Sequence, residues 1–221
     1  MRARSLSIVL TVLALGALTA CASPSAPVGG DPEGAASDGT CAYVEAPGAV
    51  RDVDAPPAEP TASGVVDVVL TTSVGDIPIV LDADRTPCTV ESFLSLAEQG
   101  YFDGSSCHRL TTSGIFVLQC GDPSATGMGG PGYNIPDELD GSETYPAGTV
   151  AMANTGSPNS GGSQFFLVYE DTQLPPSYTV FGKMNSAGLA IVQDVAAEGV
   201  QGGAGDGAPA TAVTIDAVSE R

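Results

Sequence analysis

Residues 151–168 read AMANTGSPNSGGSQFFLV, and this pattern is the most informative in the chain about its fold. Small residues and side-chain amides separate two apolar runs, and the second run begins with the adjacent pair Phe165 and Phe166. Successive side chains of a strand point to opposite faces. We therefore expect one phenylalanine in the core and the other on a cleft. An ordinary strand–loop–strand unit would also account for this stretch taken alone.

Strand-like runs rich in Val, Ile and Thr lie on both sides of this stretch. Residues 65–82 (VVDVVLTTSVGDIPIVLD) predict two strands around a Ser-Val-Gly turn. The further runs are 107–112, 116–120, 147–153, 163–169, 178–183 and 211–218. So many short strands, with few helices, favour an antiparallel barrel or sandwich over a parallel βαβ fold.

Two segments have helical periodicity. Thr86 suits an N-cap and Pro87 the first helical position, apolar residues then recur at helical spacing, and Gly100 ends the run. A second helical period covers 187–198 (AGLAIVQDVAAE).

The charge balance is strongly acidic. The chain has 7 Lys+Arg against 26 Asp+Glu, a formal net charge of −19. This argues against binding nucleic acid or anionic membrane surfaces by electrostatics, because neutralising phosphates requires clustered cations. Between Arg85 and Lys183 the single cationic side chain is Arg109, and it stands beside His108, the one histidine.

The neighbours of Arg109 bear on thiol and metal chemistry. In a strand over CHRLT (107–111), Cys107 shares a face with Arg109, and His108 points the other way. Cys107 and His108 are thus poorly placed as nucleophile and base, which disfavours a Cys-dependent hydrolase and makes His108 structural. With one histidine and neither HExxH nor CxxC, we expect no metal and no cofactor. GMGGPGY (127–133) lacks the lysine of a phosphate loop and predicts a tight surface loop.

The first 20 residues are typical of a secretory signal, because Arg2 and Arg4 precede a short apolar run. This run is shorter than the ~20 residues that a membrane-spanning helix needs. LTAC, which ends at Cys21, resembles a bacterial lipobox, in which the cysteine is acylated, with palmitate for example, and becomes the mature N-terminus. An ordinary signal peptide with an incidental cysteine is the alternative. Firm attachment would need two or more acyl chains. We expect an anchor on the outer face of the cell membrane.

The composition divides the rest of the chain into two parts. Residues 21–63 are rich in Pro, Ala, Gly and Asp and predict an extended, mostly disordered tether. CAYV (41–44) is the one segment of it that we expect to dock on the folded part. The folded domain is predicted at 64–221.

Four cysteines remain after Cys21. In an exported protein they predict two disulfides, for which three connectivities exist; four buried thiols are the alternative. A hairpin that follows Arg109 would bring Cys120 close to Cys107 as a candidate cross-strand bridge.

Three blocks, in this order and spacing, resemble the cyclophilin family of peptidyl-prolyl isomerases. They are HR followed by FVLQCGD, MANTGSPNSGGSQFF, and VFGK. The resemblance covers about 64–221 and implies a mainly β fold, a closed eight-stranded antiparallel β-barrel capped by two α-helices. It also implies an isomerase (rotamase) that accelerates X–Pro rotation in exported proteins.

The resemblance implies roles for particular residues. Arg109 is the cation that stabilises the twisted amide, and Gln119 orients the peptide carbonyl with it. Further positions match the family's substrate-binding residues. The pocket that holds the proline ring is matched by Phe116, Phe166 and Leu174, with Val117 and Tyr178 at positions where the family often has Met and His. The groove that binds the peptide backbone is matched by Ala153, Asn154 and Gln164. Within this frame the disulfides are Cys107–Cys120 and Cys41–Cys88.

Some positions depart from the family pattern. LTTSGIF (110–116) is two residues longer than usual, so the turn before the pocket differs, and TGSPN has one extra residue. Gln173 stands where cyclosporin-sensitive members carry Trp, so we expect weak cyclosporin binding.

The alternative function is a non-catalytic chaperone or scaffold that binds proline-containing segments. The presence of Arg109, Phe116 and Gln119 favours the enzyme. We expect a monomer.

Overall fold

The computed structural model describes residues 39–221. The predicted signal segment 1–20, the lipidation candidate Cys21 and the first part of the predicted tether lie outside the described residues. Within 39–221, every helix is too short or too polar to span a bilayer.

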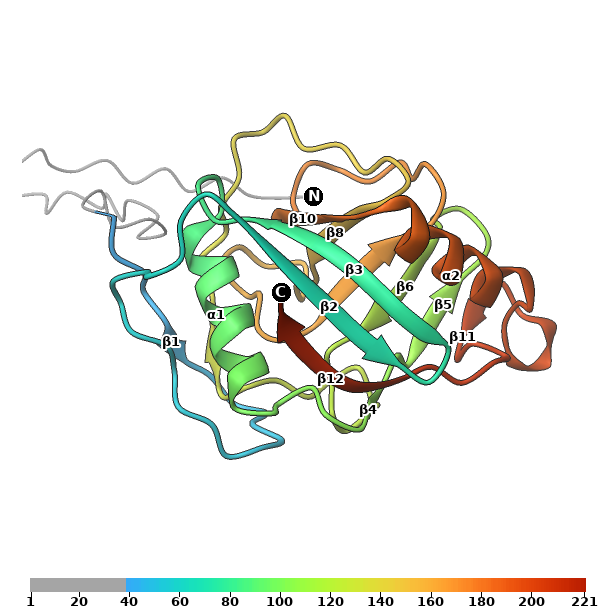
Figure 1. Cartoon of the computed structure of the whole chain (residues 1–221), viewed down its shortest axis with the longest axis horizontal. Helices are drawn as coiled ribbons and strands as arrows, with labels where there is room; N and C mark the ends of the chain where they lie inside the picture. Colours follow the sequence, from blue (N-terminus) through green and yellow to red (C-terminus); the bar gives the residue numbers. More distant parts are fainter. Residues whose placement is uncertain (1–38) are drawn as a thin grey trace, which may run out of the picture. The chain divides into compact units, whose positions relative to one another are not determined.

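The described part consists mostly of short strands, with one helix near each end of the fold (Figure 1). In chain order the elements are β1 (Val44–Glu45), β2 (Val65–Thr72), β3 (Gly75–Asp82), α1 (Pro87–Glu98), β4 (Ser105–Ser106), β5 (Arg109–Thr111), β6 (Val117–Cys120), β7 (Tyr133–Asn134), β8 (Thr149–Met152), β9 (Phe165–Val168), β10 (Val180–Met184), α2 (Ser186–Ala197), a 3-10 turn (Gln201–Gly203), β11 (Asp206–Gly207) and β12 (Thr214–Glu220). These positions confirm the predicted strand runs and both predicted helices.

The hairpin of β2 and β3 forms around the predicted Ser-Val-Gly turn. It pairs Val65 with Asp82 at one end and Thr72 with Gly75 at the other. Gly75 has φ +127, which few side-chain-bearing residues adopt, and a Cβ there would lie 3.1 Å from Ile191 Cδ1 of α2. Glycine at this position therefore allows both the turn and the packing of α2.

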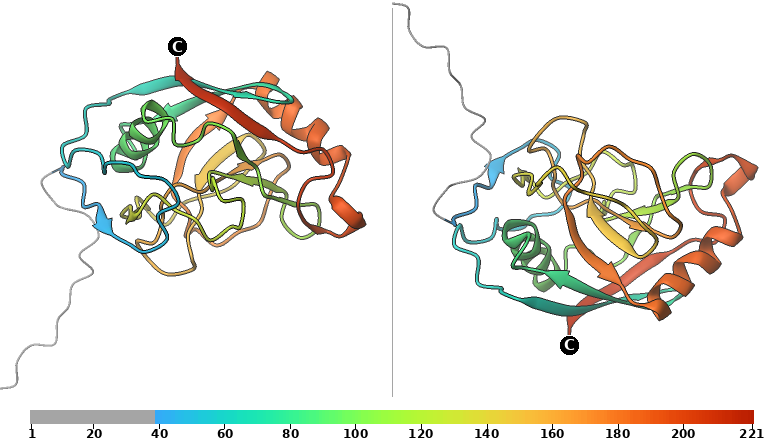
Figure 2. Two further views of the ribbon diagram at one scale, coloured as in Figure 1. Left: turned by 90° about the horizontal axis from the view of Figure 1, so that it is seen from below. Right: turned by 90° about the horizontal axis from the view of Figure 1, so that it is seen from above.

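Ten strands form one antiparallel sheet in the order β11-β5-β6-β9-β8-β10-β3-β2-β12-β4. The sheet curls around the core (Figure 2). The mainly β, antiparallel prediction is confirmed, whereas the closed ring of eight strands stays a prediction. The sheet has ten strands and not the expected eight because residues 105–111 form two separate strands, β4 and β5, and because β11 is an additional short strand that pairs with β5.

The inside of the curled sheet is apolar, and the two helices lie at its opposite ends (Figures 1 and 2). Phe93 of α1 is 2% exposed and contacts the rings of Phe102, Phe165 and Phe181 at centroid distances of 5.1–5.5 Å. Phe165 therefore belongs to the core, as one member of the pair Phe165–Phe166 was expected to do. Buried aromatic packing of this kind contributes strongly to core stability.

The N-terminus of α1 is capped from outside the helix. Thr86 occupies the predicted N-cap position, but its hydroxyl donates to Asp82 O at 2.9 Å. The carboxylate of Glu138 accepts instead from the backbone N–H groups of Cys88 and Thr89 at 2.9 and 2.8 Å. An anion at a helix N-terminus is favourable because it satisfies free N–H donors at the positive end of the dipole. Burial raises the pKa of Glu138 in spite of these bonds.

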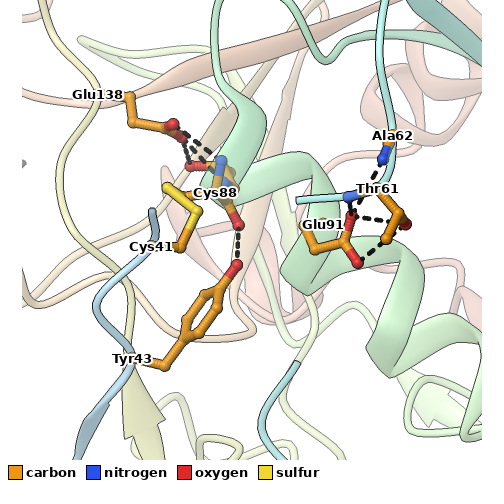
Figure 3. The surroundings of a disulfide bond; sticks show 8 residues. Cys41, Tyr43, Thr61, Ala62, Cys88, Glu91 and Glu138 are labelled. Carbon is orange, nitrogen blue, oxygen red and sulfur yellow. Dashed lines mark hydrogen bonds between the residues drawn. A yellow bond between two sulfur atoms is a disulfide. The ribbon is translucent and has the colours of Figure 1, made fainter. Parts of the chain in front are cut away.

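Residues 39–63 form an ordered arm on the domain, which we call the N-terminal arm. The prediction of a mostly disordered tether is wrong for this part, although the docking of 41–44 is confirmed. Cys41 is disulfide-bonded to Cys88, and the Tyr43 hydroxyl donates to Cys88 O at 3.0 Å (Figure 3). Buried Glu91 accepts from the backbone N–H groups of Thr61 and Ala62. The composition of the arm did not indicate this order, because the groups that bind the arm, Cys88 and Glu91, lie on the domain and are distant from it in sequence.

Both predicted disulfides are present. Cys41 pairs with Cys88 across 47 residues, and Cys107 pairs with Cys120 across 13 residues. The second bridge lies between β6 and the residues just before β5, and both of its cysteines are buried. It leaves no thiol on Cys107 for nucleophilic chemistry.

Candidate functional site

The pairing of β5 with β6 places Arg109 directly opposite Gln119. Arg109 Nη1 donates to Gln119 Oε1 at 3.4 Å, and Gln119 Nε2 donates to Gln164 Oε1 at 2.8 Å. Gln164 Nε2 then donates to the carbonyl of Gly129 at 2.9 Å. This chain of hydrogen bonds fixes which oxygen and which nitrogen each amide presents, so the polar side of the site is ordered before any ligand arrives.

Asp206 of β11 holds the guanidinium from the other side. Arg109 Nε and Nη2 donate to its two carboxylate oxygens at 2.8 and 2.7 Å, in a bidentate ion pair. The side chains of Arg109 and Asp206 are 39% and 55% exposed. The hydrogen bond from Arg109 lowers the pKa of Asp206, and the same bond raises the pKa of Arg109. No sequence pattern indicated this pairing, because Asp206 is one acid among 26 and lies 97 positions from Arg109.

Beside this pair lies a pocket of about 180 Å³ with both apolar and polar lining residues, which we call the ring pocket. The rings of Phe166 and Tyr178 meet edge to face at 5.4 Å and form part of its wall. Most of the predicted site residues meet here. The lining residues are Arg109, Ile115, Val117, Gln119, Ala153, Asn154, Phe166, Leu174 and Tyr178. Because Phe166 lines the pocket while Phe165 is in the core, the sequence expectation for this pair is confirmed.

Phe116 was predicted in the pocket and does not line it. Its ring packs edge to face on Tyr169 at 6.0 Å, against the main core. Ile115 takes the pocket position, on the same side of the chain as Val117. In the turn before Phe116, Ser113 and Ile115 form a bridge. Ile115, Val117 and Gln119 alternate along one face towards the pocket, so Phe116 between them points away from it.

A second hollow of about 410 Å³, which we call the side hollow, adjoins the ring pocket and shares Gln119, Ala153 and Asn154 with it. Gln164, predicted as a groove residue, lines this hollow and not the ring pocket. The loop 127–133, expected to be only a surface turn, forms one of its walls.

Asp122 fixes that loop from beneath. Its carboxylate accepts from the backbone N–H groups of Gly127 and Gly129 at 2.8 and 3.0 Å, and from Ser124. Burial raises the pKa of Asp122, but these hydrogen bonds outweigh it and hold the pKa below its usual range. A Cβ at Gly129 would collide with this carboxylate, so the close approach requires glycine.

His108 does not line either hollow. Burial is the main cause that lowers the pKa of its ring, which is therefore neutral at pH 7. Among residues 39–221, no group of three His, Cys, Asp or Glu is arranged to hold a metal ion.

Comparison with known proteins relates this chain to one family. The model described as "Cyclophilin type peptidyl-prolyl cis-trans isomerase/CLD" matches residues 67–220. A "Probable peptidyl-prolyl cis-trans isomerase B" of Mycobacterium tuberculosis is 47% identical over 194 residues, and its Mycobacterium leprae counterpart is 48% identical over 172 residues. These alignments cover 80% and 72% of this chain, but only 63% and 58% of the mycobacterial proteins.

Solved structures agree in fold. A crystal structure of a cyclophilin type peptidyl-prolyl cis-trans isomerase from Cryptosporidium parvum matches with a TM-score of 0.62 at 27% identity. The match covers 71% of this chain and 98% of that one. A second structure of that protein, determined in the presence of the dipeptide Ala-Pro, matches with a TM-score of 0.61 and covers 70% of this chain and 98% of that one.

The ion pair at Arg109 predicts a pH dependence of stability. Because the folded-state pKa of Asp206 is depressed, the pair stabilises the fold above the usual aspartate range of ~3.9 and loses this effect as the pH falls through the folded-state pKa. Asp206→Asn should cost at most about 1 kcal/mol at pH 7, as is usual for an exposed pair. Urea unfolding of both proteins between pH 3 and 7 should show this difference shrink towards the acidic end.

The matched control is Asp216→Asn, which removes an exposed carboxylate on β12. If Asp206→Asn and Asp216→Asn gave the same difference from the unsubstituted protein at every pH, the proposed contribution of the Arg109–Asp206 pair would be wrong.

Proposed function

This chain belongs to the cyclophilin-type peptidyl-prolyl cis-trans isomerase family, and on that premise we propose that it accelerates rotation about X–Pro bonds in exported proteins. The observation that carries the proposal is the ring pocket, where Arg109 and Gln119 face an apolar enclosure formed by Val117, Phe166 and Leu174. Such an enclosure suits a proline ring, and the polar pair stands where the adjoining amide would lie.

The barrier to be lowered is electronic. Rotation about an X–Pro bond is opposed by amide resonance, with a barrier of ~18–20 kcal/mol, and takes on the order of 10–100 s uncatalysed. In the twisted state the prolyl nitrogen becomes pyramidal and regains a lone pair. A donor that bonds this lone pair stabilises the twisted state more than the planar one, which is the requirement for catalysis. No proton transfer or covalent intermediate is needed.

Arg109 is the proposed donor. A guanidinium has five N–H groups, and three of those of Arg109 are engaged by Asp206 and Gln119. The other two N–H groups of Arg109 remain available to a substrate. Arginine stays charged at any physiological pH, and the fork that Asp206 holds in place loses little freedom when it binds. Gln119, itself held by Gln164, would orient the peptide carbonyl, and Asn154 and Ala153 would line the path of the peptide backbone.

Replacing Arg109 tests this mechanism. Arg109→Ala should lower kcat/KM on an X–Pro tetrapeptide by about 10²-fold, or ~3 kcal/mol, the usual loss for one preorganised electrostatic donor. Arg109→Lys should be intermediate, because it keeps the charge but not the planar fork. The measurement is a prolyl isomerisation assay with circular dichroism as a folding control. If the folded unsubstituted protein is no faster than buffer, the non-catalytic proline-binding function replaces the isomerase.

Adjacent substitutions test which residue forms the pocket wall. Ile115→Ala should raise KM by about fivefold to tenfold, because it removes apolar contact from the ring pocket. Phe116→Ala should instead lower the free energy of unfolding, on the order of 2 kcal/mol for a half-buried ring, with a smaller change in KM. Both variants are measured by steady-state kinetics and urea unfolding. If Phe116→Ala raised KM more than Ile115→Ala did, Phe116 and not Ile115 would form the pocket wall.

We also propose that Cys21 is acylated and anchors the protein to the outer face of the membrane. The support is the order of a charged start, a short apolar run and LTAC. Cys21→Ser should move the protein from the membrane fraction to the soluble fraction, because the acyl chains supply the membrane affinity. Cell fractionation with mass spectrometry of the N-terminus checks this, and an unmodified Cys21 in the membrane fraction would contradict it. The expected monomeric state and weak cyclosporin binding stay predictions.

A further inference from the structure

The N-terminal arm lies against the candidate site and not only against α1. Ala46 and Pro47 of the arm line the side hollow, together with the residues that the hollow shares with the ring pocket. Ala46 is half-buried and Pro47 is exposed, so the first stands within the wall and the second at its edge. The arm therefore forms part of a cavity that continues into the proposed proline site.

Backbone hydrogen bonds hold this part of the arm to the loop 127–133. Ala46 N donates to Gly132 O at 2.8 Å, and Val50 N donates to Gly130 O at 3.1 Å. Gly130 N donates back to Gly48 O at 2.9 Å. β1 also pairs with β7, so the two walls of the hollow form one hydrogen-bonded unit.

Two side-chain anchors fix the arm on either side of Ala46. The Cys41–Cys88 disulfide holds one flank to the start of α1 (Figure 3). On the other flank, Arg51 donates to the carbonyls of Gly100 and Asp103 at 2.9 and 2.8 Å, just past the end of α1. An arm fixed at both flanks can define the shape of a binding site, because little freedom remains to be lost when a ligand binds.

The side hollow has a definite chemical character. None of its lining residues carries a charged side chain. Glycines, prolines and small residues form much of its surface, and the Met128 side chain at its edge is 83% exposed. At about 410 Å³ it is larger than the ring pocket, so it accommodates a large uncharged side chain. A carboxylate that entered the hollow would lose its hydrating water, and no cationic side chain lines the hollow to compensate for that loss.

The two cavities are adjacent along a shared wall. A peptide with its proline in the ring pocket passes Ala153, Asn154 and Gln119, which border both cavities. An extended chain advances ~3.3 Å per residue, so a residue one or two positions from the proline reaches the side hollow.

We propose that the N-terminal arm is part of the substrate-binding surface, and that Ala46 and Pro47 form a specificity-determining wall that selects a large uncharged side chain near the proline. This inference rests on the proposed isomerase function, since it assigns the second residue of the same substrate. It gives the arm a role beyond fastening the chain to the domain.

The test enlarges the wall and measures selectivity. Two sets of peptides carry Gly, Leu or Glu either two positions before the proline or two positions after it. The unsubstituted protein should have a higher kcat/KM for Leu than for Gly or Glu in one set. Ala46→Phe should lower the Leu-to-Gly ratio in that set by about tenfold or more, since a misfit of a single methylene already has an effect of about tenfold and this change adds a phenyl ring. Pro47→Phe, at an exposed position, should act in the same direction and guards against misfolding of the first variant.

Val44→Phe is the matched control, because Val44 is in the same arm, is 62% exposed and does not line the hollow. It should keep the Leu-to-Gly ratio of the unsubstituted protein. An equal ratio in all four proteins would overturn the inference. Peptide affinities measured by fluorescence anisotropy separate the two proposals: absence of turnover with an intact Leu preference refutes the isomerase but not the arm wall.

Discussion

The two-residue period of the strands is the constraint on which the core and the site both depend. In β6 and β9 alternate side chains face inward and outward, so Phe165 and Leu118 enter the core while Phe166 and Gln119 face the site. Cross-strand pairing places Gln119 against Phe166 and against Arg109. One register therefore sets the apolar wall, the amide and the cation together, and a slip of one residue would exchange core and site.

The sequence predicted the features that depend on local pattern. Alternation and turn residues located the strands, and periodicity with Pro87 and Gly100 located α1. The family resemblance supplied the pocket, the groove and the disulfide pairs. The exception was Phe116, which packs on Tyr169, while Ile115, on the same face as Val117 and Gln119, lines the pocket. A motif match preserves residue types across an insertion, but it does not preserve the face to which each residue points.

What the sequence did not predict depends on partners brought close only by folding. Glu138 caps α1 from 49 positions away, and Asp206 holds Arg109 from a strand of two residues. The order of residues 39–63 has the same origin, because Glu91 and Cys88 supply the fastening. Composition describes how a segment would behave alone, whereas a buried carboxylate elsewhere determines whether its N–H groups have partners. In a chain of net charge −19, carboxylates such as those of Glu91, Asp122 and Glu138 have a structural role as acceptors for backbone N–H groups.

The Cys41–Cys88 bridge has a mechanical consequence. A covalent link between these residues provides a shorter route for tension than the intervening chain, so a pull through the segment before Cys41 passes directly to α1 at Cys88. Residues 42–87, which include most of the arm, β2 and β3, form a closed loop off that covalent route. The β1–β7 pairing is thus protected from being peeled apart, and the wall of the side hollow keeps its shape under strain applied from the N-terminal side.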